Sequence, residues 1–399
     1  MNLRNHIQLA LGYFIMAALL GLLLRSFHTF EIPIDYKFVV HGHSHIALLG
    51  WVYMGLTTLL YKLFLDQQGL NRKYRRIFWF TQVTLIGMLV TFPFQGYALL
   101  SIIFSTLFLL ASYWFAWFFI KNVPVGLKRA NSYQCIRFAL IYMVLSSIGP
   151  WLLGIIMNTL GAGSIWYRLA IYFYLHFQYN GWMVLALIGL FLFVLEQREI
   201  IVPKKIFRNF FWSMNFGIVF TFFLSTLWIP PSIVYNILGG LGALFQLMAL
   251  VLLTKFALGG NFGFKNVFSE FQSKALTLVV VLLFVKMGLQ LLTGLPYFAK
   301  LASIFLDFTI AYLHLTFLGV ITIALFTFLD YFKLLEMGNK TFALFLMGFV
   351  LTEGLIFYKG IAAWLGFGIF EGYFEFLAFA SLLIFVSLVS LLVPRRLGT

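Results

Sequence analysis

The stretch His45-Ile-Ala-Leu-Leu-Gly-Trp51 lies inside a long apolar segment, and its pattern occurs twice more. The other copies are His176-Phe-Gln-Tyr-Asn-Gly-Trp182 and His314-Leu-Thr-Phe-Leu-Gly-Val320. Each copy, the His–Gly motif, has a His followed five residues later by Gly and then by an aromatic or apolar residue. The copies recur at intervals of about a third of the 399-residue chain, which indicates a repeated architecture.

The composition is that of a polytopic membrane protein. Hydrophobic residues make up 62% of the chain and charged residues 10%, and the mean hydropathy is +0.99. A soluble domain lacks the polar residues to cover so much apolar surface, so the lipid bilayer is the expected partner. The net charge of +15 is interpreted as membrane topology and not as nucleic-acid binding. We expect a multi-pass protein of a bacterial inner (cytoplasmic) membrane.

About 20 apolar residues cross the hydrocarbon as a helix, and on this measure the sequence predicts an all-α integral membrane protein with twelve transmembrane helices. They form one transmembrane domain, 1–399, with three pseudo-repeated four-helix units at about 1–130, 131–260 and 261–399. The predicted spans are 6–26, 39–63, 76–95, 99–120, 132–157, 167–195, 206–228, 234–256, 274–295, 302–330, 341–360 and 369–393.

Basic residues gather in alternate connections between the spans. The first connection of this kind holds Arg72, Lys73, Arg75 and Arg76, whereas the connections in between hold isolated basic residues such as Lys37. The positive-inside rule therefore predicts that both termini are cytoplasmic. The His–Gly motifs then lie on the second, sixth and tenth spans, at comparable depth in the outer half of the membrane.

Five of the seven histidines lie in or just before the motif: His41, His43, His45, His176 and His314. Neutral imidazole is the usual biological ligand of iron, copper and zinc, and the single cysteine, Cys135, leaves histidine as the main candidate ligand. His41 and His45 share one helical face and His43 points nearly the opposite way, so the second span can serve two pockets. The motif Gly leaves room for close approach by a helix or by a flat macrocycle.

Topology and motifs together resemble subunit I of the haem–copper oxidases and the related NnrS-type membrane haem proteins. His41-Gly-His-Ser-His45 and Tyr312-Leu-His-Leu315 are similar to the stretches that hold the low-spin haem in that superfamily, and His176 lies on the helix that supplies a copper ligand. The resemblance implies one or two b-type haems, with copper or another transition metal as a further cofactor.

The chain also departs from the oxidase pattern. Tyr312 stands where catalytic oxidases carry the His that holds the high-spin haem, span 206–228 contains no His, and Asn180 replaces a Tyr. We therefore do not expect an oxygen-reducing, proton-pumping terminal oxidase. If the protein is an enzyme, the resemblance implies an oxidoreductase of the haem–copper oxidase or nitric oxide reductase type.

A bis-histidine haem remains compatible with these residues, with His314 opposite either His45 or His43. A second site can combine the remaining histidine of the second span with His176, as another haem or, if His314 also turns inward, as a three-histidine metal site. Bis-histidine ligation suits electron transfer, whereas an open coordination position suits binding of nitric oxide or oxygen.

Five further polar side chains are candidates for the site. Tyr174 and Tyr312 can act as weak ligands or hydrogen-bond partners, and Asp307 can orient a ligand or face the outer aqueous rim. Lys286 and Glu353 lie deep in the ninth and eleventh spans and can pair, line a proton route or belong to a substrate path.

The leading hypothesis is a b-type haem-binding membrane protein in electron transfer or in a respiratory or stress role related to nitric oxide or oxygen. An electron donor or a respiratory subunit would be its partner. The alternative is a transporter that carries a transition metal or a small solute past the intramembrane histidines. A purely structural membrane subunit would leave the repeated histidines unexplained.

Overall fold

The computed structural model describes residues 2–392, except 228, 230–232 and 260–263. Helix accounts for 85% of the structure, and the described residues contain no β-strand. The chain forms two compact units, which we describe separately. Unit 1 comprises the described residues of Met1–Val123 and Leu325–Thr399, and unit 2 comprises those of Pro124–Ala324.

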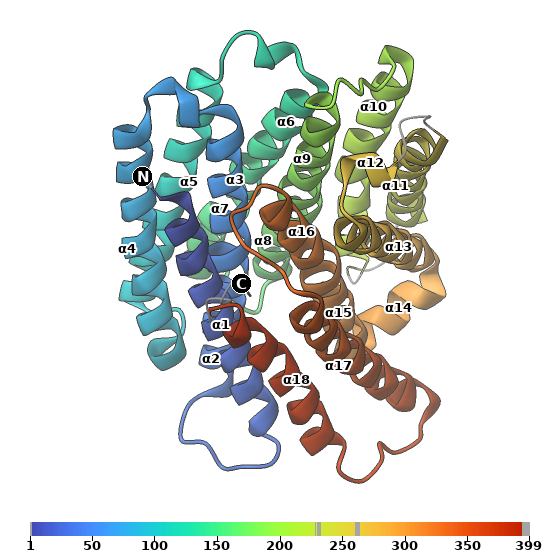
Figure 1. Cartoon of the computed structure of the whole chain (residues 1–399). Helices are drawn as coiled ribbons and strands as arrows, with labels where there is room; N and C mark the ends of the chain where they lie inside the picture. Colours follow the sequence, from blue (N-terminus) through green and yellow to red (C-terminus); the bar gives the residue numbers. More distant parts are fainter. Residues whose placement is uncertain (1, 228, 230–232, 260–263, 393–399) are drawn as a thin grey trace. The chain divides into compact units, whose positions relative to one another are not determined.

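Unit 1 contains the helices of the first part of the chain, α1 to α5, and those of its last part (Figure 1). Its elements are α1 (Leu3–Ser26), α2 (Tyr36–His45), the π-helix η1 (Ile46–Tyr53), α3 (Met54–Phe64), the short 3-10 helix η2 (Asp66–Gln68), α4 (Asn71–Gln95), α5 (Leu99–Asn122), most of α16 (Ile323–Tyr331), α17 (Asn339–Leu365) and α18 (Tyr373–Ser390).

Unit 2 contains the central helices of the chain. Its elements are η3 (Leu127–Arg129), α6 (Asn131–Ser146), α7 (Ile148–Thr159), α8 (Ile165–His176), the π-helix η4 (Phe177–Val184), α9 (Leu185–Glu196), α10 (Lys204–Thr221), η5 (Phe222–Thr226), α11 (Ile233–Gly259), α12 (Phe264–Val267), α13 (Glu270–Thr293), α14 (Pro296–Ile304), α15 (Leu306–His314) and the π-helix η6 (Leu315–Thr322).

Eleven continuous helical segments of the described chain are long and apolar enough to cross a membrane, so the protein is a multi-pass membrane protein. They match eleven of the predicted spans, and the predicted break after Gln95 is confirmed because α4 ends there and α5 begins at Leu99. The predicted span 206–228 corresponds to α10 and η5. Helix α10 is not among the eleven, since its 18 residues include three basic side chains at its start. Residues 228 and 393, the predicted ends of two spans, lie outside the described residues.

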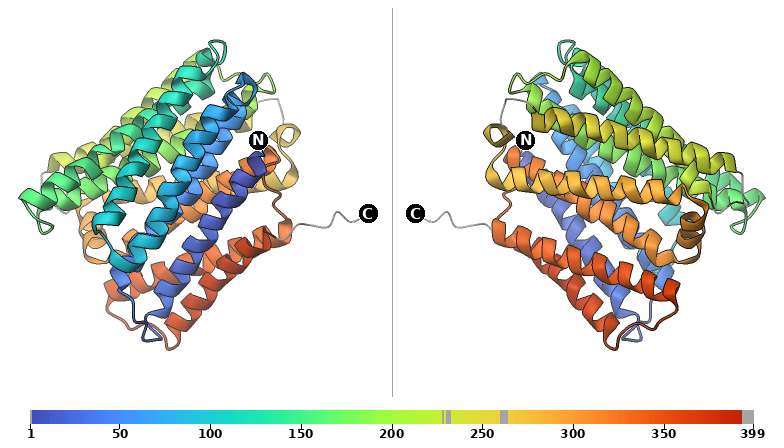
Figure 2. Two further views of the ribbon diagram at one scale, coloured as in Figure 1. Left: turned by 90° about the vertical axis from the view of Figure 1, so that its left-hand side faces the viewer. Right: turned by 90° about the vertical axis from the view of Figure 1, so that its right-hand side faces the viewer.

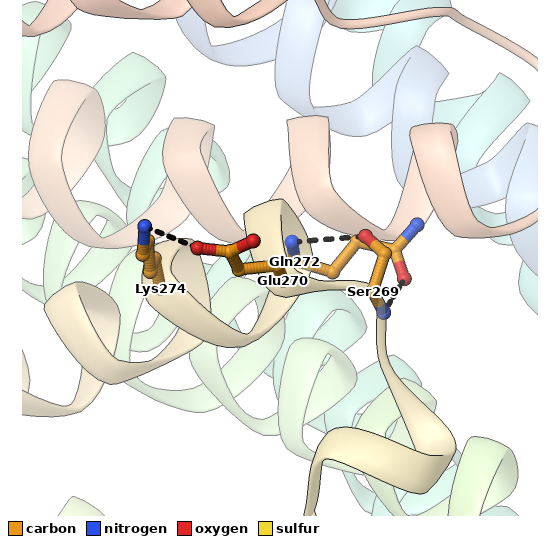
Figure 3. A network of polar contacts seen from close by, with 4 residues as sticks. All are labelled: Ser269, Glu270, Gln272 and Lys274. Carbon is orange, nitrogen blue, oxygen red and sulfur yellow. Dashed lines mark hydrogen bonds and ion pairs between the residues drawn. The ribbon is translucent and has the colours of Figure 1, made fainter.

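Polar side chains fix where the helices begin. At the start of α13 the Ser269 hydroxyl accepts a hydrogen bond from the Gln272 backbone N–H at 3.2 Å, and the Gln272 side-chain oxygen accepts one from the Ser269 N–H at 3.0 Å (Figure 3). This reciprocal capping box satisfies two N–H groups that the helix itself leaves without partners. An ion pair of 2.7 Å between Lys274 and Glu270 stabilises the same first turns.

Glycines allow neighbouring spans to pack closely within each unit. In unit 2, α10 lies along α11, and a Cβ added to Gly242 would come within 2.5 Å of the Thr221 backbone nitrogen (Figure 2). In unit 1, α17 lies along α18, where a Cβ on Gly348 would lie 2.9 Å from the Ile384 nitrogen. Small residues at such crossings are typical of helix association in membranes, because packing replaces the hydrophobic effect there.

Candidate functional site

All three His–Gly motifs have the same backbone. His45, His176 and His314 are each the last residue of an α-helix, and each is followed by an eight-residue π-helix. The motif Gly is the fifth residue of the π-helix in every copy. Because π-helical turns are rare and frequently occur at functional sites, the shared backbone supports a functional role for the motif. The sequence predicted plain helical spans here and gave no sign of the π-helices.

The motif glycine allows a neighbouring helix to come close. A Cβ added to Gly50 would lie 2.6 Å from the Tyr13 Cβ on α1, and one added to Gly181 would lie 2.6 Å from the Tyr142 Cβ on α6. Any larger residue would push the helices apart. The predicted close approach is therefore confirmed for these two copies, with a helix as the neighbour.

The two tyrosines extend the repeat to a third helix. The Tyr13 hydroxyl donates to Gln82 Oε1 on α4 at 2.9 Å, and the Tyr142 hydroxyl donates to Asn215 Oδ1 on α10 at 3.0 Å. Each unit thus contains a tyrosine that packs against the motif Gly and bonds to a buried amide side chain on another helix, from α1 to α4 in unit 1 and from α6 to α10 in unit 2.

His45 is bonded within its own helix. Its Nδ1 lies 2.9 Å from the His41 carbonyl oxygen, which only accepts, so Nδ1 carries the hydrogen and Nε2 carries the lone pair. The ring stacks on Phe92, with centroids 4.3 Å apart, and the Tyr97 hydroxyl lies 3.4 Å from Nε2. His43 is held by another helix instead, since its Nδ1 lies 2.8 Å from the Ala17 carbonyl oxygen of α1.

His314 repeats the arrangement of His45. Its Nδ1 lies 2.9 Å from the carbonyl oxygen of Ile310, four residues earlier, so its lone pair is likewise on Nε2. Both imidazoles are half-buried. A metal-bound histidine usually donates its second ring N–H to a carbonyl or carboxylate, and both rings have this donor arrangement.

His176 differs from both, because it belongs to a buried network within unit 2. Its Nε2 donates to the Ile218 carbonyl oxygen at 2.7 Å, so its Nδ1 is the acceptor of the Asn180 amide N–H at 3.2 Å. The Asn180 Oδ1 in turn accepts from the Lys286 ammonium at 2.6 Å, and Gln290 Oε1 accepts from the same ammonium at 3.0 Å. The donors therefore run in one direction from Lys286 through Asn180 to His176 and the Ile218 carbonyl, and Gln290 is a separate acceptor of the same ammonium.

The Lys286 side chain is enclosed by polar and aromatic groups. It is 1% exposed, and its Nζ lies 5.6 Å from the ring centre of Tyr179 and 5.4 Å from that of Tyr312. Among the described residues no carboxylate forms an ion pair with it. Ring faces and amide oxygens thus replace a counter-ion, an arrangement that suits a functional cation more than a structural one.

The remaining predicted site residues lie in other surroundings. Glu353 is 7% exposed in unit 1, and neither of its carboxylate oxygens has a hydrogen-bond partner in the described structure. Asp307 is half-buried in the first turn of α15, and Tyr174 is half-buried against Gly149 of α7. His41 is half-buried with its ring edge-on to Tyr97. The predicted pairing of Lys286 with Glu353 would join two different units, and the polar partners that the structure gives Lys286 are Asn180 and Gln290.

Sequence reasoning missed the link between Lys286 and His176. The available signal was Asn180 itself, an amide in the middle of a long apolar span, one helical turn after the motif His. In the described part of the chain, no group of three or more His, Cys, Asp or Glu side chains lies close enough to hold a metal ion.

Comparison with known proteins identifies no family for this chain. No protein-family model matches it, and a search of the curated proteins finds no match.

Proposed function

We propose that this chain is a b-type haem-binding membrane protein in which His45 and His314 would each supply an imidazole ligand to haem iron. The observation that carries the proposal is their shared local geometry: each ends an α-helix, precedes a π-helix and bonds its Nδ1 to the carbonyl four residues earlier at 2.9 Å. This arrangement puts the ligand lone pair of both rings on Nε2. His43 is the second choice on its helix, because its ring is held by α1.

The donor set fits haem in its chemistry. Neutral imidazoles whose second nitrogens donate to carbonyls are the donors that b-type haem takes, and haem held by these residues would supply a one-electron redox centre. The His41 carbonyl fixes the His45 tautomer, and Phe92 restricts the rotation of its ring.

His176 is excluded from the proposed pair because its Nε2 donates to the Ile218 carbonyl oxygen at 2.7 Å, which leaves Nδ1 with the lone pair, and Nδ1 accepts from Asn180. Haem binding at His45 would need to displace only the Tyr97 hydroxyl, which lies 3.4 Å from its Nε2. These properties support electron transfer, whereas a role in handling nitric oxide or oxygen would need an open coordination position.

The test is an absorption spectrum of the purified protein, oxidised and dithionite-reduced, with and without nitric oxide or carbon monoxide. We expect a sharp reduced α-band that His45→Ala and His314→Ala abolish and that His176→Ala retains. His28→Ala, at an exposed histidine whose ring stacks on Phe374, is the matched control. Restoration of the band in His314→Gly by added imidazole would separate ligation from folding. A colourless protein, or an unchanged band in His314→Ala, would overturn the proposal.

We further propose twelve membrane crossings, with α10 and η5 as the additional one and both termini cytoplasmic. The basic residues at the start of α10 suit a helix that begins on the cytoplasmic side, and an even number of crossings places both ends together. Reporter fusions at the two termini should report the cytoplasm, and opposite compartments would contradict this topology.

A second candidate function, transport of a small solute or transition ion, is favoured by the Lys286 network alone. A buried ammonium with two amide partners can mark a translocation path, and its charge favours an anionic solute over a metal cation. Uptake into vesicles that Lys286→Met abolishes, in a protein without haem, would support this function over the first.

A further inference from the structure

A cavity of about 240 Å³ opens where α4 begins and α5 ends in unit 1. Lys73 and Arg76 line it from the first turns of α4, and Lys121 lines it from the last turn of α5. Trp114 and Trp117 of α5 also line the cavity. The cavity is separate from the histidines, and neither the haem proposal nor the transport alternative makes use of it.

The charge of this wall has one sign. No acidic residue lines the cavity, and none of the three basic side chains forms an ion pair with a described carboxylate. The Lys121 ammonium lies 4.5 Å from the ring centre of Trp117, which holds the cation at the cavity by a cation–π interaction. The N-terminal end of α4 adds partial positive charge to the same place. The cavity therefore attracts an anion.

The two tryptophans indicate the depth of the cavity in the membrane. Trp114 is 40% exposed and Trp117 is 58% exposed, and both lie near the end of a span that is long and apolar enough to cross a membrane. Exposed tryptophans at span ends gather at the level of the lipid headgroups, because their rings are apolar and their N–H is polar. A phosphate group that enters this cavity from the bilayer is part of a lipid headgroup.

We propose that this cavity binds the phosphate headgroup of an anionic phospholipid. Lys73, Arg76 and Lys121 contact the phosphate, while the tryptophan rings pack against the glycerol region and the first part of the acyl chains. Basic pockets between transmembrane helices are suited to such headgroups, and lipid binding at this site also ties the ends of α4 and α5 to the membrane surface.

The experiment is native mass spectrometry of the full-length protein with phosphatidylglycerol and, separately, with phosphatidylcholine. We expect phosphatidylglycerol to remain bound and phosphatidylcholine to dissociate. Because each basic residue near an anionic surface contributes roughly fivefold in affinity, the triple variant K73Q/R76Q/K121Q should lose bound phosphatidylglycerol by at least about tenfold. The three side chains are exposed, so the variant should elute and melt like the parent protein.

The matched control is K204Q/K205Q/R208Q, which removes the same charge from the start of α10 in unit 2. We expect this control to retain phosphatidylglycerol. Equal loss in both triple variants would show unspecific charge attraction and overturn the proposal, as would unchanged binding in K73Q/R76Q/K121Q. A last measurement uses inorganic phosphate with the detergent-purified protein. If phosphate binding is lost in K73Q/R76Q/K121Q and phosphatidylglycerol does not bind the parent protein, the cavity is a site for free phosphate and the lipid proposal fails.

Discussion

The surroundings of His45 in unit 1 and of His176 in unit 2 share one backbone but differ in chemistry. In both, an α-helix ends at the His, a π-helix follows, and the motif Gly lies against a tyrosine of an earlier helix, Tyr13 of α1 or Tyr142 of α6. Yet the His45 Nδ1 bonds to its own helix, whereas His176 bonds through both nitrogens to a network that contains Lys286. A repeated scaffold therefore does not imply a repeated function.

The difference depends on one motif position, the fourth residue after the His. Leu49 and Leu318 stand there in the first and third copies, and Asn180 stands there in the second. One helical turn separates this position from the His, so an amide there can bond to the imidazole and a leucine cannot. Asn180 accepts from Lys286 with its other end, so the second copy includes a buried cation.

The largest expected effect comes from converting the second copy to the first at this position. Asn180→Leu leaves Lys286 with Gln290 as its remaining hydrogen-bond acceptor and should cost about 3 kcal/mol of unfolding free energy, since a buried charge loses a partner. Lys286→Met should cost about 1–3 kcal/mol, because it leaves the buried oxygens of Asn180 and Gln290 without their donor. In detergent unfolding measurements the double variant should lose clearly less than the sum of the two single losses. Additive losses would show that Asn180 does not act through Lys286.

A smaller effect tests what the two regions have in common. Gly50→Ala and Gly181→Ala should each destabilise the protein by about 2 kcal/mol, because the new Cβ meets a tyrosine Cβ at 2.6 Å in both. Gly12→Ala and Gly154→Ala are the controls, one from each unit, where a Cβ has nothing within 4 Å and helix propensity should give a slight gain. Thermal unfolding of the four variants in one detergent makes the comparison. A loss at Gly181 without a loss at Gly50 would break the proposed equivalence.

The smallest effect concerns the tyrosine hydroxyls. Tyr13→Phe and Tyr142→Phe each remove one buried hydrogen bond to an amide oxygen, at 2.9 and 3.0 Å, and should cost about 1 kcal/mol or less. The two variants are each other's control, so equal shifts in unfolding midpoint would sharpen the comparison. A shift several times larger in one variant would show that its tyrosine hydroxyl contributes more to stability than a single hydrogen bond.

The candidate site was predictable in its positions but not in its bonds. The repeat identified His45, His176 and His314, and the motif Gly correctly predicted close helix approach at Gly50 and Gly181. The sequence predicted a ligand role for His176 as well, in a second site with the remaining histidine of the second span. It could not assign Asn180 and Gln290 to Lys286, because the Lys286–Asn180 bond joins residues far apart in the chain, 106 positions, and depends on how α13 packs.

The sequence by itself determined that this is a helical, multi-pass membrane protein with a three-fold histidine motif, because hydropathy over about 20 residues and residue spacing are local properties. Only the tertiary structure decided which nitrogen of each imidazole holds the hydrogen, since that depends on which carbonyl lies opposite. Only the tertiary structure, likewise, showed that the motif winds as a π-helix and that a buried lysine bonds to one copy. The physical reason is that a hydrogen bond depends on ångström-scale distances between groups that sequence order does not bring together.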